Sequence, residues 1–348
     1  MTLHVFNPEH DLALAADLSN FTAPHAGRQL RADLGFLPAL WAKSDDVVLV
    51  ENADDAERRF RRLVRKPFGR FVEKTQTAQL PITDVDVWGW DKAVRASLLR
   101  QGVKAELLPT EAAIAAIRDL SHRRYASIIL EQLQGDGIIG KATMADQLTT
   151  LQAYLDDKGR IVVKAPWSSS GRGVRFVEER LSTADEGWVK NIIARQGAIM
   201  MEPYYDKVKD FGMEFVSDGK GHVDYLGLSL FHTSNGAYTG NILASEEEKI
   251  EMISRYIPED LLGSVRVKIV ELTGVLFNQK YKGPFGVDMM IVGRDDRKGF
   301  LLHPCVEINL RRTMGHVALS LTSQTRGLPQ AMCIDFDGTI YKMQIKRL

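Results

Sequence analysis

Residues 162–177 read VVKAPWSSSGRGVRFV, an apolar strand that ends in Lys164 and runs into a loop of small residues. Backbone N–H groups in such a loop can close over phosphate oxygens without interference from Cβ atoms, and Lys164 adds a fixed positive charge. The loop residues expected at the phosphates are Ser168, Ser169, Ser170, Gly171 and Gly173. The stretch indicates nucleotide binding, with a β-hairpin whose turn is rich in Ser and Gly as the alternative.

A second group of polar residues lies further along the chain. The segments GPFGVDMMIV, from Gly283, and HPCVEINLRR, from His303, are typical of strands, and the polar turn GRDDRKG joins them. A hairpin brings Asp288 close to Glu307, and Asn309 shares a face with Glu307 because alternate residues of a strand point to the same side. Three converging oxygen ligands suit Mg²⁺ between nucleotide phosphates, with a structural ion-pair network as the alternative.

Two arginines follow this strand directly. Arg311 and Arg312 offer bidentate donors that can neutralise charge on a phosphoryl group during its transfer. They are the candidate catalytic residues.

Composition narrows the class of protein. With 348 residues the chain is long enough for two or three lobes, and its 45 basic and 45 acidic residues give no net charge that would favour nucleic acid. Two cysteines cannot build a disulfide framework, and Cys305, within an apolar strand, is expected to be a buried thiol. No secretory leader or apolar run of membrane-spanning length is present in the sequence, so we expect a cytoplasmic protein without a membrane partner.

The N-terminal third predicts an open α/β sheet. Strands are expected at residues 3–6, 46–50 and 103–108, a helical segment between the first two, and helices from residue 91 and over 111–120. Since ligands bind at the carboxyl ends of such strands, the polar residues after the first strand are substrate-side candidates; a polar turn that caps the next helix is the alternative. These residues are Asn7, Glu9, His10 and Asp11.

Two segments resemble motifs of other protein classes, a basic nucleic-acid surface and a P-loop. The arginines of residues 54–71 go round a helix and follow Asp54 and Asp55, which favours a solvated helix over a nucleic-acid surface. GDGIIGKA, from Gly135, fits part of a P-loop, but Ala142 stands where Mg²⁺ binding needs a hydroxyl. We instead expect Thr143 to cap an amphipathic helix.

Further strands and loops supply more candidates. A helix is expected over residues 184–195, and an apolar strand over 198–201 that ends at Glu202, where Pro203 breaks the pairing and exposes an edge to an adenine. Glu214, in a strand pattern, faces either a ribose hydroxyl or water. The polar segment SLFHTSNGAYTGNIL is predicted to be a substrate-side loop or an exposed hairpin turn. Its candidate substrate residues are Asn235, Tyr238 and Asn241.

In order, these motifs resemble the ATP-grasp family. VVKAPWSSSGRGV resembles the lid strand and phosphate loop, MMEPYY the hinge that meets adenine, GVDMMIV the strand with the first magnesium carboxylate, and VEINLRR the strand that completes the metal site. The motifs span residues 121–325. The sequence departs from the family where an early phosphate-contacting lysine is common, since Arg123 and Arg124 stand there, and where Leu310 replaces a frequent proline.

The resemblance implies an α/β chain in which an N-terminal open α/β domain, residues 1–118, precedes a two-lobed ATP-grasp fold. The lid or small lobe would span residues 119–200, and the C-terminal lobe with the magnesium site residues 201–348. The implied metal ligands are Asp288, Glu307 and Asn309. The implied nucleotide contacts are Lys164, Ser168, Ser169, Ser170, Gly171, Gly173, Glu202, Glu214 and Arg124.

The activity implied is that of an ATP-dependent ligase. ATP, with Mg²⁺ or Mn²⁺, would phosphorylate a carboxylate, and an amine or thiol would displace phosphate from the acyl phosphate. A small-molecule kinase on the same scaffold and a non-catalytic ATP-binding module are the alternatives. The expected partners are small-molecule carboxylates and amines; the oligomeric state stays open, with a homodimer among the expected states.

Overall fold

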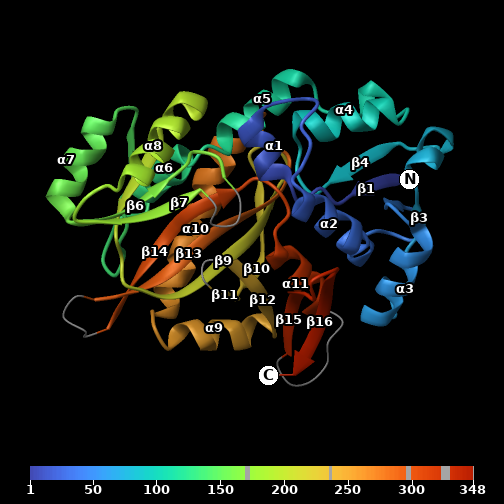
Figure 1. Ribbon diagram of the computed structural model, residues 1–348. Helices are drawn as coiled ribbons and strands as arrows, with labels where there is room; N and C mark the ends of the chain where they lie inside the picture. Colours follow the sequence, from blue (N-terminus) through green and yellow to red (C-terminus); the bar gives the residue numbers. More distant parts are fainter. Residues whose placement is uncertain (169–172, 235–236, 295–298, 323–329, 348) are drawn as a thin grey trace. The chain divides into compact units, whose positions relative to one another are not determined.

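The computed structural model describes residues 1–168, 173–234, 237–294, 299–322 and 330–347, and Figure 1 shows their secondary structure. The chain divides into two compact units. Unit 1 comprises Met1–Arg118, Thr239–Ser245 and Arg311–Leu348, and unit 2 comprises Asp119–Tyr238 and Glu246–Leu310. The sequence-based division at residues 118 and 200 stays a prediction.

Unit 1 is built on a parallel sheet. Its strands are β1 (Thr2–Val5), β2 (Val47–Leu49), β3 (Arg70–Val72) and β4 (Asp84–Val87), in the order β3-β2-β1-β4. Leu3, Val47 and Val85 pack with Leu98 of the following helix in a buried cluster. The predicted α/β fold with an N-terminal open sheet is confirmed, with the first two strands within a residue of their expected ends.

Helices connect these strands. They are α1 (His10–Ala16), α2 (His25–Leu34), η1 (Leu37–Leu40), α3 (Ala53–Leu63), η2 (Lys74–Gln79), α4 (Lys92–Arg100), η3 (Ala105–Leu107) and α5 (Glu111–Leu120). The basic segment forms α3, which Asn52 caps. Asp55 contacts Arg59 at 2.6 Å and Glu57 contacts Arg61 at 2.7 Å, and exposed pairs of this kind each contribute about 0.3–0.5 kcal/mol. The prediction of a helix with balanced charges is confirmed.

One predicted strand is wrong. Residues 103–108 contain the short 3-10 helix η3 instead, because the place beside β1 is taken by β4. The apolar residues that suggested a strand, Val103 and Leu108, are buried in the core of unit 1. In β4 acidic residues alternate with valines, so its hydrophobic signal is weak.

The C-terminal residues also belong to unit 1. They form α11 (Met314–Thr322), β15 (Gln330–Phe336) and β16 (Tyr341–Arg347). β15 pairs antiparallel with β16 and with residues 240–243 of β12 (Ala237–Leu243). The backbone N–H of Tyr341 donates to Asp33 of α2 at 2.8 Å, which joins the last strand to the N-terminal helices.

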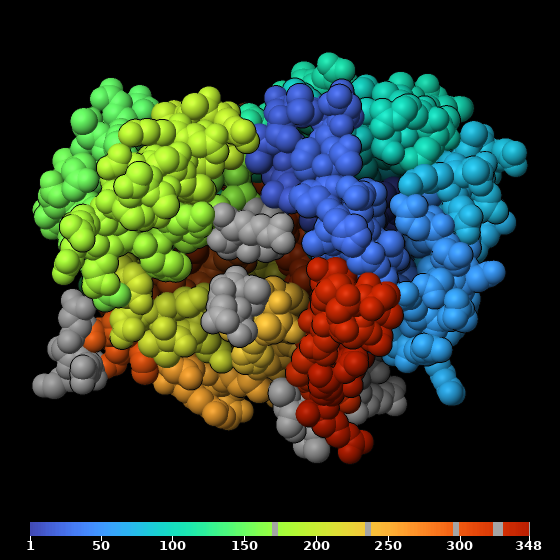
Figure 2. Space-filling view, in the orientation of Figure 1, coloured from blue at the N-terminus to red at the C-terminus, as the bar shows by residue number. Residues whose placement is uncertain are grey.

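Unit 2 contains two antiparallel sheets. The smaller has the order β5-β8-β6-β7, with β5 (Thr143–Ala145), β6 (Arg160–Lys164), β7 (Val174–Glu178) and β8 (Ile199–Pro203). α7 (Leu148–Lys158) and α8 (Thr183–Gln196) pack on it through Leu151, Leu155 and Val189. Figure 2 shows these residues as one green to yellow-green body.

Two local predictions in this sheet are wrong. Thr143 is not a helix cap, because β5 pairs it with Met201 and α7 begins only at Leu148. Pro203 does not stop the pairing of β8, since it lies opposite Ile161 and β8 is an inner strand. The predicted strand ending at Lys164 and the predicted helix over 184–195 are confirmed as β6 and α8.

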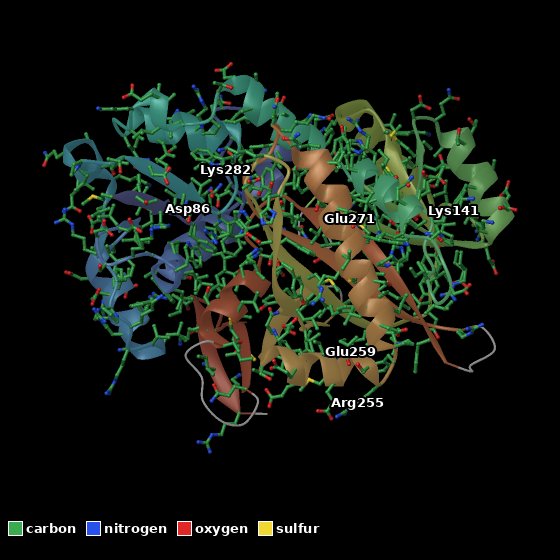
Figure 3. The ribbon with its side chains drawn as sticks, turned by 180° about the vertical axis from the view of Figure 1, so that it is seen from behind. Asp86, Lys141, Arg255, Glu259, Glu271 and Lys282 are labelled. Carbon is green, nitrogen blue, oxygen red and sulfur yellow. The ribbon has the colours of Figure 1, made fainter. Side chains whose placement is uncertain are left out.

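The larger sheet of unit 2 has the order β10-β9-β13-β14. Figure 3 shows α10 across one face of this sheet, with Glu259 at its start and Glu271 further along. Phe211, Phe215, Phe277 and Phe285 are fully buried. The strands of this sheet are β9 (Lys207–Ser217), β10 (Val223–Ser229), β13 (Gly283–Gly293) and β14 (Phe300–Asn309). Unit 2 also contains α6 (Arg124–Gln132), β11 (Phe231–Ser234), α9 (Glu246–Ser254) and α10 (Glu259–Phe277).

Within the described ranges, no helix is long and apolar enough to cross a membrane.

Candidate functional site

The polar face of the larger sheet is set by strand register. β9, β13 and β14 are antiparallel neighbours, so residues directly opposite one another point to the same side. Asp288 lies opposite both Gly212 and Glu307, and Gly286 lies opposite both Glu214 and Asn309. Two rows of three residues therefore share one face, each with a glycine among polar side chains.

The glycines leave this face open above the sheet, since a strand glycine often marks close approach of a ligand. Within the rows, Asn309 Nδ2 donates to Asp288 Oδ2 at 3.1 Å. Asn309 is 8% exposed and Glu214 3%, so both are held away from bulk water. The predicted hairpin, and the shared face of Glu307 and Asn309, are confirmed.

The donor set fits a divalent cation. Asp288, Glu307 and Asn309 supply oxygen atoms only, from adjacent strands, as Mg²⁺ prefers. The Asp288 to Asn309 contact shows that these side chains reach one another without rearrangement of the strands. These residues are suited to hold Mg²⁺, and their assignment as ligands stays a prediction.

Arg123 joins this face to the base of the Ser/Gly loop. Its Nη2 donates to Glu307 Oε1 at 2.7 Å, while Nη1 donates to the Ala165 carbonyl at 2.5 Å and to Ser168 Oγ at 2.7 Å. Arg123 is 8% exposed. One guanidinium thus lies between a candidate metal ligand and a candidate phosphate loop.

Arg124 has different surroundings. Its guanidinium contacts the Asp119 carboxylate and lies 4.9 Å from the centre of the Tyr125 ring. Arg123 is therefore the arginine that the structure brings to the other site residues. A role of Arg124 at the nucleotide stays a prediction.

The loop base is closed by the backbone. The Ala165 N–H donates to the Gly173 carbonyl at 2.8 Å. A Cβ atom on Gly173 would lie 2.3 Å from Ser168 Oγ, so only glycine fits beside that serine. Ser169, Ser170 and Gly171 lie outside the described residues.

Lys164 is held by a carboxylate. Its Nζ lies 2.6 Å and 2.7 Å from the two oxygens of Glu202, and the two residues are 7% and 5% exposed. The pair comes from the neighbouring strands β6 and β8. A buried pair of this kind orients both groups but contributes little net stability, because desolvation offsets the attraction.

Next to this pair lies a residue that the sequence did not single out. His303 is 1% exposed, and neither ring nitrogen has a hydrogen-bond partner within the described residues. Its ring meets the Tyr205 ring edge-on at 5.6 Å. Burial, partly opposed by Glu202, lowers the His303 pKa to about 4, so the imidazole is neutral at pH 7. The sequence signal available was that His303 precedes Glu307 by four residues on one strand, an even spacing that indicates a shared face.

The pKa values of Tyr205 and of the nearby Cys305 thiol are also shifted. Burial and the Glu202 charge raise the Tyr205 pKa to about 12. Burial raises the Cys305 pKa as well, and Cys305 is 2% exposed, which confirms the predicted buried thiol. Neither group ionises at neutral pH, so neither is a candidate nucleophile or base.

Arg311 and Arg312 belong to unit 1. Arg311 makes a bidentate contact with Asp11, with Nη2 2.7 Å from Oδ2 and Nε 2.9 Å from Oδ1. Arg312 Nη2 donates to Asp86 at 2.8 Å, and its guanidinium lies 4.4 Å from the Trp41 ring centre.

Asp86, labelled in Figure 3, connects Arg312 to the parallel sheet. It also contacts Nδ1 of His4 on β1 at 2.9 Å, and His4 is 5% exposed. Burial opposes ionisation of Asp86, but His4 and Arg312 outweigh it and lower its pKa. Arg311 and Arg312 are thus each paired with a carboxylate of unit 1, and a catalytic role for either stays a prediction.

The predicted substrate loop is partly strand. Asn241 is 1% exposed and lies opposite Met332 in β15, so at Asn241 the segment is a buried strand and not the predicted loop or exposed turn. Tyr238 is half-buried. Asn235 lies outside the described residues. The substrate role of Asn235, Tyr238 and Asn241 stays a prediction.

Of the other N-terminal candidates, His10 is buried against Asp91 at 3.3 Å, and Asn7 donates to Asp91 at 3.1 Å. Glu9 contacts Arg31 at 2.5 Å. These residues follow β1, as the sequence predicted.

No protein-family model matches the chain, and no curated protein matches its sequence. Solved structures match its fold. The biotin carboxylase domain dimer of 2-oxoglutarate carboxylase from Hydrogenobacter thermophilus, in complex with MgADP, ADP and bicarbonate, matches with a TM-score of 0.52 at 12% identity, over 96% of this chain and 74% of that chain.

N5-carboxyaminoimidazole synthetase from Staphylococcus aureus, complexed with ADP, matches with a TM-score of 0.50 at 13% identity, over 96% of this chain and 82% of that chain. At such identities the similarity concerns the fold alone. The chain has the ATP-grasp fold, as its motifs predicted.

Proposed function

We propose that the chain is an ATP-dependent ligase that joins a carboxylate to an amine or thiol. A carboxylate oxygen attacks the γ-phosphorus of ATP and ADP leaves; the nucleophile then attacks the acyl carbon, phosphate leaves, and the proton of the nucleophile passes to solvent. The observation that carries this proposal is the polar face of β9, β13 and β14, with Arg123 between it and the Ser/Gly loop.

The nucleotide would lie along Arg123 and Lys164. Both cations are buried and oriented by carboxylates, Glu307 and Glu202, so little side-chain freedom is lost when phosphates bind. The neutral rings of Tyr205 and His303 would line the end of the site near Glu202. Both solved structures described above contain ADP, which supports a nucleotide in this fold.

Asp288, Glu307 and Asn309 would hold Mg²⁺. When bound, the ion neutralises charge on the phosphate oxygens during transfer. Arg123 donates to Glu307, so it would lie beside that ion. Arg311, oriented by Asp11, would stabilise the charge on the transferred phosphoryl group.

A carboxylate acceptor is favoured over a hydroxyl. The carboxylase domain matched above was bound to bicarbonate together with MgADP, and bicarbonate presents the same pair of oxygens as a carboxylate. Among the buried groups described at the site, His303 and Tyr205 have pKa values far from neutrality, and a hydroxyl acceptor would need a base that they do not supply.

The test is a carboxylate library incubated with ATP, Mg²⁺ and hydroxylamine. A ligase forms an acyl phosphate that hydroxylamine traps as a hydroxamate, with equal release of ADP. A kinase instead gives a stable phosphate ester and no hydroxamate. Phosphoester formation would overturn the ligase proposal, and absence of nucleotide binding would overturn the site itself.

A further inference from the structure

Unit 1 contains a cavity that the nucleotide chemistry does not use. It has a volume of about 370 Å³ and lies at the carboxyl ends of β1 and β2, beside the start of α1 and along α4. That volume is within the range of small-molecule sites. Its wall includes Asn7, Glu9, Arg31, Ser97 and Gln101.

The position of the cavity follows from the sheet topology. The chain leaves β1 to form β2 and β3 on one side and returns to place β4 on the other. Loops on the two sides of β1 therefore diverge, and this switch point is where open α/β sheets bind ligands.

One carboxylate in the wall has an unmet hydrogen bond. Glu9 is 9% exposed, and its Oε1 accepts from Arg31 Nη1 at 2.5 Å. Its Oε2 has no hydrogen-bond partner within the described residues. Burial raises the Glu9 pKa, partly opposed by Arg31, which shows how strongly this carboxylate is removed from water. A buried acceptor without a partner is costly, so a donor from a ligand would be stabilising.

The same wall has an unmet donor. Arg31 Nε has no hydrogen-bond partner within the described residues, and the Glu51 carboxylate lies 3.8 Å from it, beyond hydrogen-bond distance. A donor and an acceptor thus lie together in a concave wall. This pairing matches a ligand that carries groups of both kinds.

Positive charge exceeds negative charge around the cavity. The basic residues in its lining are Arg28, Arg31, Lys74 and Arg100, and the acidic ones are Glu9, Glu51 and Asp91. Four cations against three anions leave one positive charge. Lys74 is already paired with Glu51 at 2.9 Å, whereas Arg28 and Arg100 are exposed. A ligand with a negative group would complete the balance.

We propose that this cavity binds a small anion that also carries a free amino group, in the manner of an amino acid. Its anionic group lies among the arginines, and its amino group donates to Glu9 Oε2. Binding is independent of the proposed ligase activity.

The test is calorimetric titration of the full chain without nucleotide. The probes are the standard amino acids, β-alanine and O-phosphoethanolamine, each compared with its N-acetyl form or with its counterpart that lacks nitrogen. We expect at least one amino-bearing anion to bind, and its counterpart to bind at least tenfold more weakly. If no probe binds, or if counterparts bind equally, the inference is overturned.

Variants locate the binding site. Glu9→Gln should weaken the bound probe at least tenfold, whereas Glu57→Gln, the same change on the surface of α3, should leave it unchanged. Arg100→Gln, at the exposed rim, should weaken the probe without a change in folding. Equal affinity of the probe for Glu9→Gln and Glu57→Gln would contradict the proposed site. If Glu9→Gln does not fold, an unchanged affinity in Arg100→Gln would contradict it instead. Failure of hydroxamate trapping alone would leave this binding result standing.

Discussion

The polar face of the larger sheet in unit 2 and the cavity of unit 1 gather their polar residues in different ways. In unit 2, Asp288, Glu307 and Asn309 lie on paired strands joined by a short turn, so local register places them together. In unit 1, Glu9 and Arg31 come from separate helical segments and meet only because β1 lies at the centre of the sheet. The first arrangement can be predicted from the spacing of residues in the sequence, whereas the second depends on the order of strands in the sheet.

The two regions also treat charge differently. In unit 2 the cations Lys164 and Arg123 are 7% and 8% exposed, and each has a carboxylate partner. In unit 1 the buried Glu9 carboxylate accepts a hydrogen bond from Arg31 through only one of its two oxygens. We read the first as a site prepared for phosphates and a metal ion, and the second as a site completed by its ligand.

The largest expected effect concerns the metal ligands. Asp288→Asn or Glu307→Gln should reduce ATP turnover by at least about 100-fold, because a cation at these oxygens supplies several kcal/mol of charge stabilisation. The melting temperature should change little in Asp288→Asn, which keeps the volume and whose partner Asn309 is neutral, and should fall in Glu307→Gln, which leaves buried Arg123 without its carboxylate. Glu251→Gln, an exposed carboxylate of unit 2, is the matched control. A collapse in melting temperature together with activity in Asp288→Asn would favour a structural ion-pair network.

Lys164→Met should lower the stability of the protein by about 3–5 kcal/mol, because it leaves the Glu202 carboxylate buried without its cation. Chemical denaturation measures this loss. The double variant Lys164→Met with Glu202→Gln should recover most of the stability but not ATP affinity. If the double variant binds ATP like the wild type, Lys164 does not hold phosphates.

Arg311→Ala should lower the rate by about 100-fold, corresponding to about 3 kcal/mol, while ATP affinity stays near that of the wild type. Arg312→Ala should instead destabilise unit 1, because Asp86 loses a charged partner beside buried His4. Steady-state kinetics and denaturation of both variants separate the two roles. The opposite pattern would assign the catalytic role to Arg312.

The effect that is smallest at neutral pH is a pH dependence of stability from His303. Its folded pKa of about 4 lies below the ordinary value of 6.5. The unfolded chain therefore takes up the proton first, so this contribution is complete above pH 6.5 and is lost as the pH falls toward 4, by up to about 1.4 kcal/mol per pH unit.

His303→Leu should flatten the acid side of the stability curve, and His222→Leu, at an exposed histidine of the same unit, should not. Identical slopes in the wild type and His303→Leu would show that His303 is not held neutral.

Much of this fold could be predicted from the sequence. Strand alternation and a polar turn defined the hairpin of β13 and β14, and the buried strand ending in Lys164 was recognisable from its valines. β4 was missed because acidic residues occupy its alternate positions. Residues 103–108 were predicted as a strand because their apolar side chains are buried, although they contain a 3-10 helix. Tertiary context decided both cases.

The site was less predictable where it depends on partners distant in sequence. From the sequence Arg124 was named as the nucleotide contact, and only the fold directs Arg123 to Ser168 and Glu307. The ion pair of Lys164 with Glu202, and the isolation of His303, follow from strand neighbours that no local pattern specifies. Residue types were predictable there, but their contacts were not.

The most direct test of the central claim, that β13 and β14 hold Mg²⁺ at the phosphates of a bound nucleotide, is the Mg²⁺ dependence of ATP affinity. It is measured by calorimetric titration of the wild type and of the double variant Asp288→Asn with Glu307→Gln. We predict that Mg²⁺ strengthens ATP binding at least tenfold in the wild type and leaves it unchanged in the double variant. An equal gain in both proteins would contradict the claim.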